Sequence, residues 1–70
     1  MAEIVSEMVA NVWKVLVSVG DQVTEGDTLV ILESMKMEIP VEATVSGKVE
    51  EVRVVEGGVV QEGDVIAVIS

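Results

Sequence analysis

The chain contains two similar halves, and this duplication restricts the possible folds more than any other sequence feature. Sliding the sequence by 37 positions places residues 23–27 on residues 60–64, so the pattern Val-x-Glu-Gly-Asp occurs twice. The agreement continues into the apolar run 29–32, which falls on 66–69. Two copies are too few for a solenoid, in which several stacked repeats bury one another's faces. The sequence therefore predicts one domain built from two related halves.

The apolar residues of the chain favour strands over helices. Half of all residues are hydrophobic and most of these are valine or isoleucine, whereas a single residue, Trp13, is aromatic. β-branched side chains pack well on pleated sheets. Short apolar runs bounded by Gly-Asp pairs are typical of strands joined by tight turns. We predict an all-β domain, with strands at residues 4–6, 11–19, 28–33, 36–41, 47–55 and 65–69 and shorter pieces near positions 23 and 60.

Gly26 and Gly63 precede the same predicted strand in the two halves. Glycine accepts positive φ angles without steric cost, so both residues are predicted to shape turns. A phosphate-binding reading would require a glycine-rich loop that leads into a helix, and neither half has helical periodicity. We therefore assign these glycines a structural role.

The spacing of apolar residues changes from three to two after Val12 and again after Val49. An extra residue in each strand, a β-bulge, would explain both changes. The duplication also places Trp13 on Glu50, which predicts that the tryptophan lies on the outer, partly solvated face of its strand. It either lies flat on neighbouring side chains, which is the simpler interpretation, or anchors a partner.

Composition excludes most catalytic chemistry. The chain has no cysteine and no histidine, which leaves no disulfide, zinc site, thiolate or histidine base. Thirteen acidic and four basic residues give a net charge of −9, which opposes binding to nucleic acids and anionic membranes. The N-terminus has no signal-peptide pattern, and no apolar run approaches the roughly 20 residues that span a bilayer. A cytoplasmic protein is expected.

The most distinctive local motif, Glu33-Ser34-Met35-Lys36-Met37, lies where the two halves meet. The strands on either side are so close in sequence that a hairpin must join them, with Met35 and Lys36 at its tip. Such tips favour Asn-Gly or other glycine-containing pairs, which accept positive φ. A Met-Lys pair departs from this preference, and such departures from local sequence preference often mark functional positions. Lys36 could be a solvated turn residue whose neighbouring methionines cover the end of the core, but two methionines around one exposed amine favour an attachment point.

This motif resembles the attachment motif of biotinyl domains, usually Glu-Ala-Met-Lys-Met, in the biotin/lipoyl attachment family. Residues 15–27 and 43–49 are similar to the stretches on either side of that motif, so the resemblance covers nearly the whole chain, read as one attachment domain over residues 1–70. The chain departs from the family pattern at Ser34, where alanine is usual, at Thr44, where proline is usual, and at Val9-Ala10, where Pro-Gly is usual.

The resemblance implies a flattened β-barrel or sandwich of two four-stranded antiparallel sheets related by a pseudo-twofold axis. It implies that biotin is attached covalently to Lys36, and that Glu33, Ser34, Met35 and Met37 are recognised by a biotin protein ligase. The expected protein is a non-catalytic, metal-free carrier that moves a carboxyl group for a biotin-dependent carboxylase or carboxyltransferase. Exposed lysine amines are mostly protonated at neutral pH, so the ligase must supply the activation. A monomer is expected.

Two other functions remain open, and a third is disfavoured. Lipoyl domains typically have Asp before and Ala or Ser after the acceptor lysine, so the methionines around Lys36 favour biotin, but a lipoyl ligase could modify the same lysine, alone or in addition. An unmodified β-sandwich could act purely as an interaction module. An enzyme that uses Lys36 in a Schiff base would need a desolvated pocket, which a hairpin tip does not offer.

Overall fold

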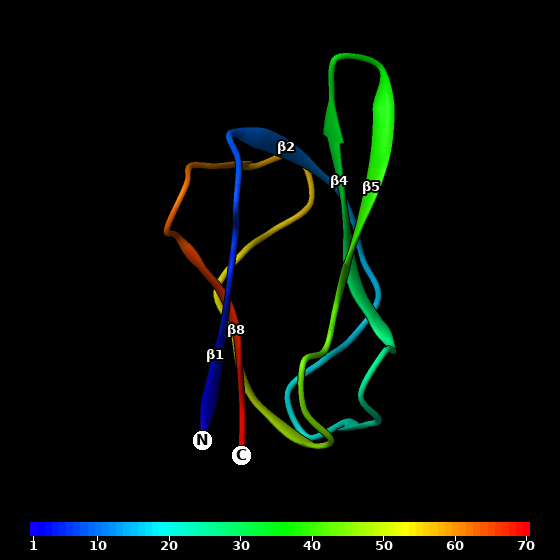
Figure 1. Cartoon of the computed structure of the whole chain (residues 1–70), viewed down its shortest axis with the longest axis vertical. Coiled ribbons are helices and arrows are strands. Elements are labelled where there is room, and N and C mark those ends of the chain that lie inside the picture. The colour runs from blue at the N-terminus through cyan, green and yellow to red at the C-terminus, as the bar shows by residue number, and fades with distance from the viewer.

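The chain folds into eight strands, which the computed structural model describes over all 70 residues. The strands are β1 (Ala2–Val5), β2 (Ala10–Val15), β3 (Gln22–Val23), β4 (Thr28–Ser34), β5 (Met37–Glu42), β6 (Gly47–Val52), β7 (Val59–Val60) and β8 (Val65–Ile69). They form two antiparallel four-stranded sheets, ordered β1-β8-β6-β3 and β5-β4-β2-β7 (Figure 1). The predicted all-β architecture is confirmed. No helix is present that could cross a membrane.

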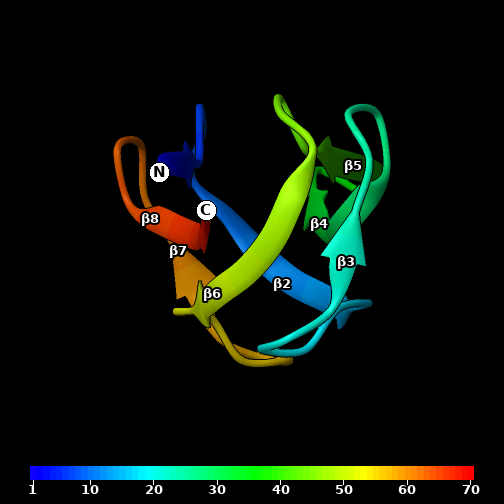
Figure 2. The same ribbon diagram turned by 90° about the horizontal axis from the view of Figure 1, so that it is seen from below.

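The two sheets are equivalent under the duplication. Adding 37 to the residue numbers of β2 and β3 gives β6 and β7, and the same shift carries the first five residues of β4 onto β8 and β1 onto the last four residues of β5. Each short strand pairs with the other half, since β3 pairs with β6 and β7 pairs with β2. The view along the long axis shows β2 of one sheet and β6 of the other crossing in projection (Figure 2). The halves are thus interlocked rather than merely stacked.

Symmetry-related residues also build the core. Leu29 and Ile66 are both fully buried, and Leu32 and Ile69 are each 1% exposed. Complete burial of an aliphatic side chain contributes roughly 1.5–3 kcal/mol to folding. No buried side-chain polar atom lacks a partner, because the one buried polar residue, Ser6, donates its hydroxyl to the Met8 carbonyl at 2.7 Å. The two halves therefore stabilise the domain in equivalent ways.

The turns before β4 and β8 have the same construction. Gly26 and Gly63 have φ angles of +95° and +90°, as predicted for structural turn glycines. Asp27 accepts a hydrogen bond from the Thr24 amide at 2.8 Å, and Asp64 accepts one from the Gln61 amide at 2.9 Å. Each turn is closed by a side-chain carboxylate and needs a glycine beside it.

Both predicted bulges are present. The register shifts between Val12 and Lys14 in β2, and between Val49 and Glu51 in β6. Trp13 is the extra residue of the first bulge and is 41% exposed, as expected for an outer face. The amine of Lys14 lies 5.6 Å from the centre of its ring, within the range of a cation–π contact.

Several predicted strand limits were wrong. The strands expected at residues 11–19 and 47–55 end at Val15 and Val52. The reason is that the chain changes sheets: the Leu16 amide bonds to Leu29 in one sheet, whereas the Gly20 amide bonds to Val49 in the other. β1 and β5 are also displaced by one or two residues from the predicted positions 4–6 and 36–41.

The molecule is elongated, with extents of 31 × 18 × 17 Å. The hairpin of β4 and β5 protrudes at one end, and both termini lie at the opposite end (Figure 1). The termini are close together because Ala2 pairs with Ile69 across β1 and β8. We call these the hairpin end and the terminal end.

Candidate functional site

The tip of the β4–β5 hairpin carries Lys36. Ser34 and Met37 form the last pair of the ladder, so Met35 and Lys36 alone make the turn. Their φ angles are +53° and +65°. Two consecutive positive φ angles are the signature of a type I′ turn, whose twist matches that of the flanking strands. The predicted two-residue hairpin is confirmed, and its turn forms the end of the protrusion (Figure 1).

The type I′ turn is energetically unfavourable for the two residues that form it, Met35 and Lys36. A residue other than glycine in the left-handed region loses roughly 1–2 kcal/mol to a clash between its Cβ and its backbone. Met35 and Lys36 are the only non-glycine residues with positive φ in the chain. The backbone strain of the molecule outside glycine is therefore concentrated at the candidate site, as strained residues often are in functional regions.

A like-charge pair adds to this cost. Glu33 and Glu38 face one another directly across β4 and β5, and both are exposed. Like charges in directly opposite positions destabilise a sheet. The only ion pair in the structure joins Arg53 to Glu51, whose hydrogen bond and negative charge raise the pKa of Arg53. No carboxylate forms an ion pair with the Lys36 amine.

Met35 and Met37 lie outside the core. Met35 is 91% exposed and Met37 is 63% exposed, so the interpretation that they cover the end of the core is wrong. Ser34, the last residue of β4, is half-buried, while Glu33 before it is exposed. The five motif residues therefore share one hairpin, with two flexible apolar side chains on either side of an exposed amine. Exposed methionines are common at surfaces that contact partners.

Residues outside the hairpin join this surface. A shallow hollow of about 220 Å³ lies beside the tip and is lined by Met35 and Glu33 from the hairpin, and by Val9, Asn11 and Val59 from elsewhere. Val9 and Val59 are each 63% exposed. Neither was predicted as a site residue. Comparison of the two halves could have identified both valines. The equivalent positions in the other half hold serine and glutamine, so valine at an exposed position differs from its counterpart.

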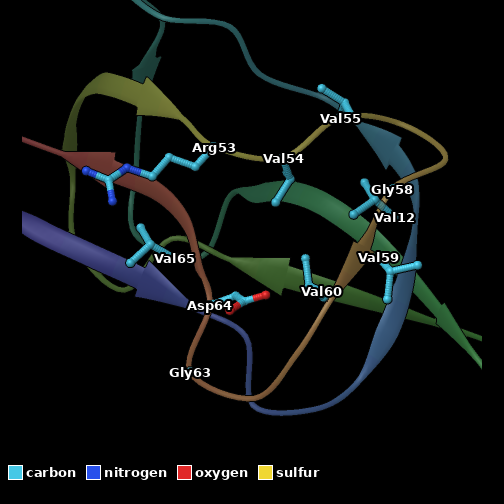
Figure 3. A pocket seen from close by; sticks show the side chains of 10 residues that line it. All are labelled: Val12, Arg53, Val54, Val55, Gly58, Val59, Val60, Gly63, Asp64 and Val65. Atoms are coloured by element: carbon cyan, nitrogen blue, oxygen red, sulfur yellow. The ribbon is translucent and has the colours of Figure 1, made fainter.

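No lysine lines either of the other two hollows. The largest, of about 420 Å³, lies between the segment before β7 and the turn before β8 (Figure 3). Its two charged side chains are already engaged, Arg53 by Glu51 and Asp64 by the Gln61 amide. A third hollow of about 270 Å³ separates the edge strands β1 and β5. No group of acidic residues is placed to hold a metal ion. Of the three hollows, the one lined by Met35 is therefore the one that adjoins the motif lysine.

Comparison with known proteins identifies the family of the chain. The sequence model of the family described as "Biotin-requiring enzyme" matches residues 1–69. The biotinylated protein TB7.3 homolog of Mycobacterium leprae is 62% identical over 71 residues that cover 100% of both chains. The biotin/lipoyl attachment protein of Bacillus subtilis is 53% identical over 91% of this chain and 88% of its own length.

Comparison of the fold with solved structures identifies the same family. The Kluyveromyces lactis urea carboxylase contains a region that superposes on 99% of this chain with a TM-score of 0.92 and 42% identity, and that makes up 6% of the enzyme. The chain belongs to the biotin/lipoyl family. It is a biotin-requiring carrier domain, homologous to part of a carboxylase, and the family and fold implied by the sequence are confirmed.

Proposed function

We propose that Lys36 is the residue to which a biotin protein ligase attaches biotin, and that the domain then serves a biotin-dependent carboxylase. One observation supports this above all: the amine stands at the tip of a strained, protruding hairpin, exposed and without an ion-pair partner. In a family that requires biotin, that is the position from which an amine can enter another protein's active site.

The attachment is an acyl transfer. The ligase first joins the biotin carboxylate to ATP, which releases pyrophosphate and leaves the carboxyl carbon activated as an acyl adenylate. The Lys36 nitrogen attacks that carbon, an amide bond forms, the bond to the phosphate oxygen breaks and AMP leaves. The proton lost by the attacking neutral amine passes to a base of the ligase, because the chain has no histidine and no carboxylate forms an ion pair with Lys36.

The domain contributes presentation rather than catalysis. Closing the hairpin with a two-residue turn fixes the backbone of Lys36, so less conformational freedom is lost when the tip docks. Met35 and Met37 provide apolar contacts on either side of the amine, and Glu33 and Ser34 continue the recognised surface along β4. Attached biotin would supply the carboxyl-carrying chemistry.

A carboxylase is the proposed user of the carrier because the matching region of the urea carboxylase is nearly identical in fold. The net charge of −9 favours a partner with a basic surface around its active-site entrance. Both the ligase and the carboxylase would meet the same acidic carrier, so both interactions should weaken as salt is added.

Lipoate is the second candidate for Lys36. The Bacillus subtilis relative is named for both acids, and it is 53% identical to this chain. The exposed tip places no wall around the amine that would select one acyl chain over the other. The choice would then lie with the ligases, and a lipoyl ligase could also use this hairpin.

Mass spectrometry of the intact protein tests both acids. The chain is incubated with biotin, ATP, Mg²⁺ and a purified biotin protein ligase, and in parallel with lipoate and a lipoyl ligase. We expect one biotinyl group per chain, mapped by peptide digestion to Lys36. Lys36→Arg should remove all labelling without changing the unfolding midpoint, whereas Lys14→Arg and Lys48→Arg should label normally. Labelling of the Lys36→Arg protein would show that the acceptor lies elsewhere.

A further inference from the structure

The apolar surface beside the hairpin is formed by Val9, Val59 and Met35, which we call the hairpin patch. These three side chains line one shallow hollow, although they come from the loop before β2, from β7 and from the hairpin turn. Each is more than 60% exposed. In a chain this small, three exposed apolar side chains gathered at one place call for an explanation.

The duplication supplies an internal control for this patch. The same backbone construction at the terminal end places Ser46 at the position of Val9 and Gln22 at the position of Val59. Both polar residues are exposed. Since the fold forms equally well around serine and glutamine at one end, it does not require valine at the other. The valines are there for a reason other than folding.

Val9 also gives up a hydrogen bond that its counterpart makes. The Ser46 hydroxyl accepts a hydrogen bond from the Glu25 amide at 2.9 Å. The residue equivalent to Glu25 is Glu62, and valine has no oxygen to accept from its amide. A hydrogen bond of this kind contributes about 0.5–1.5 kcal/mol to stability. The hairpin end therefore carries an apolar surface in place of a local stabilising contact.

We propose that the hairpin patch is a docking surface for the biotin protein ligase. This inference rests on the proposed modification of Lys36. A ligase must bring its active site to the lysine amine itself, and so must cover the surface next to the hairpin. A carboxylase acts on the far end of the long biotinyl-lysine arm and can work without touching that surface. Contacts formed at the patch would thus be specific to the attachment reaction.

Charge defines the complementary surface of the ligase. Glu33 lines the hollow beside the valines, and Glu38 faces it across the hairpin. The surface that fits here is apolar at its centre and carries lysine or arginine at its rim. Opposite charges at a rim act mainly on the association rate and its dependence on salt, while the apolar centre supplies affinity.

The residues at the terminal end provide the substitutions for the test. The variant Val9→Ser with Val59→Gln gives the hairpin end the side chains that its counterpart already has. We expect kcat/KM for biotinylation by a purified ligase to fall about ten-fold, mostly through KM, since a few central contacts dominate protein recognition. The unfolding midpoint should stay the same or rise, because serine can restore the bond to Glu62.

A matched control removes an equally exposed valine from the other end. Val19 is 65% exposed and adjoins Gly20, whose amide bonds to Val49 near the termini. Val19→Gln should be biotinylated at the wild-type rate. If the wild type is labelled and the double variant is labelled equally fast, the hairpin patch is not a docking surface, while the proposed function stands. If the wild type is not labelled at Lys36, both proposals fail.

Discussion

The hairpin end and the terminal end of this domain are two versions of the same construction. Both have a bulged strand, a turn closed by an aspartate and a core layer of aliphatic residues in equivalent positions. They differ at the tip. One end has a strained turn, an opposed pair of glutamates and the hairpin patch, whereas the other has the two termini and, at the positions equivalent to Val9 and Val59, serine and glutamine. What the ends share belongs to folding, and what distinguishes them belongs to function.

Substitutions in the core should have the largest effects and should be equal in the two halves. Leu29→Ala and Ile66→Ala each leave a cavity at a fully buried position, which costs about 2–5 kcal/mol. Urea denaturation of the two variants should give similar losses of unfolding free energy. A loss more than twice as large in one half would mean that the core is not shared evenly.

Replacing either turn glycine by alanine should lower the unfolding free energy less than the core substitutions do, and by a similar amount at both positions. Gly26 and Gly63 have similar φ angles, and a Cβ on either would meet no atom within 4 Å, so backbone strain is the whole effect. We expect Gly26→Ala and Gly63→Ala each to lower the unfolding free energy by at least about 1 kcal/mol. Unchanged denaturation midpoints would contradict the assigned turn geometry.

Relieving the strain at the hairpin tip should stabilise the domain, whereas the preceding substitutions destabilise it. Met35→Asn places a residue that tolerates positive φ where the methionine side chain packs against almost nothing. The unfolding free energy should rise by about 0.5–1 kcal/mol, with slower biotinylation. Met37→Asn is the control, because Met37 does not have a positive φ. A gain in both variants would show that strain at the turn is not the cause.

The smallest effect is expected from the opposed glutamates. Glu38→Lys turns the repulsion from Glu33 into attraction and should stabilise the domain by about 0.2–1 kcal/mol. The gain should shrink in high salt, since both side chains are exposed. Thermal unfolding at two salt concentrations measures it, and a gain that persists at high salt would point to packing rather than charge.

Much of the fold could be predicted because each signal occurs twice. The spacing around Val12 and Val49 located both bulges, and the two short apolar runs located β4 and β8. The ends of β2 and β6 could not be predicted. Apolar alternation continues through Val17 and Val54, which still pack against the core after the chain has left its sheet. Alternation reports burial, not the strand partner.

The candidate site was predictable in part. The motif located the hairpin and put Lys36 at its tip, although the residues there argue against a type I′ turn. The opposition of Glu33 and Glu38 depends on the register, which is known only once the turn length is known. Val9 and Val59 are far from the motif in sequence and meet Met35 only because β2 pairs with β7.

The position of the termini determines how this molecule can be tethered. Met1 and Ser70 lie side by side at the end furthest from the hairpin (Figure 1). A linker, a fused protein or a solid support joined to either terminus would hold the domain by its base and leave the tip facing outwards. The same geometry suits a domain embedded in a longer polypeptide, as its counterpart is in urea carboxylase. Anchoring and access to the lysine are therefore independent of each other.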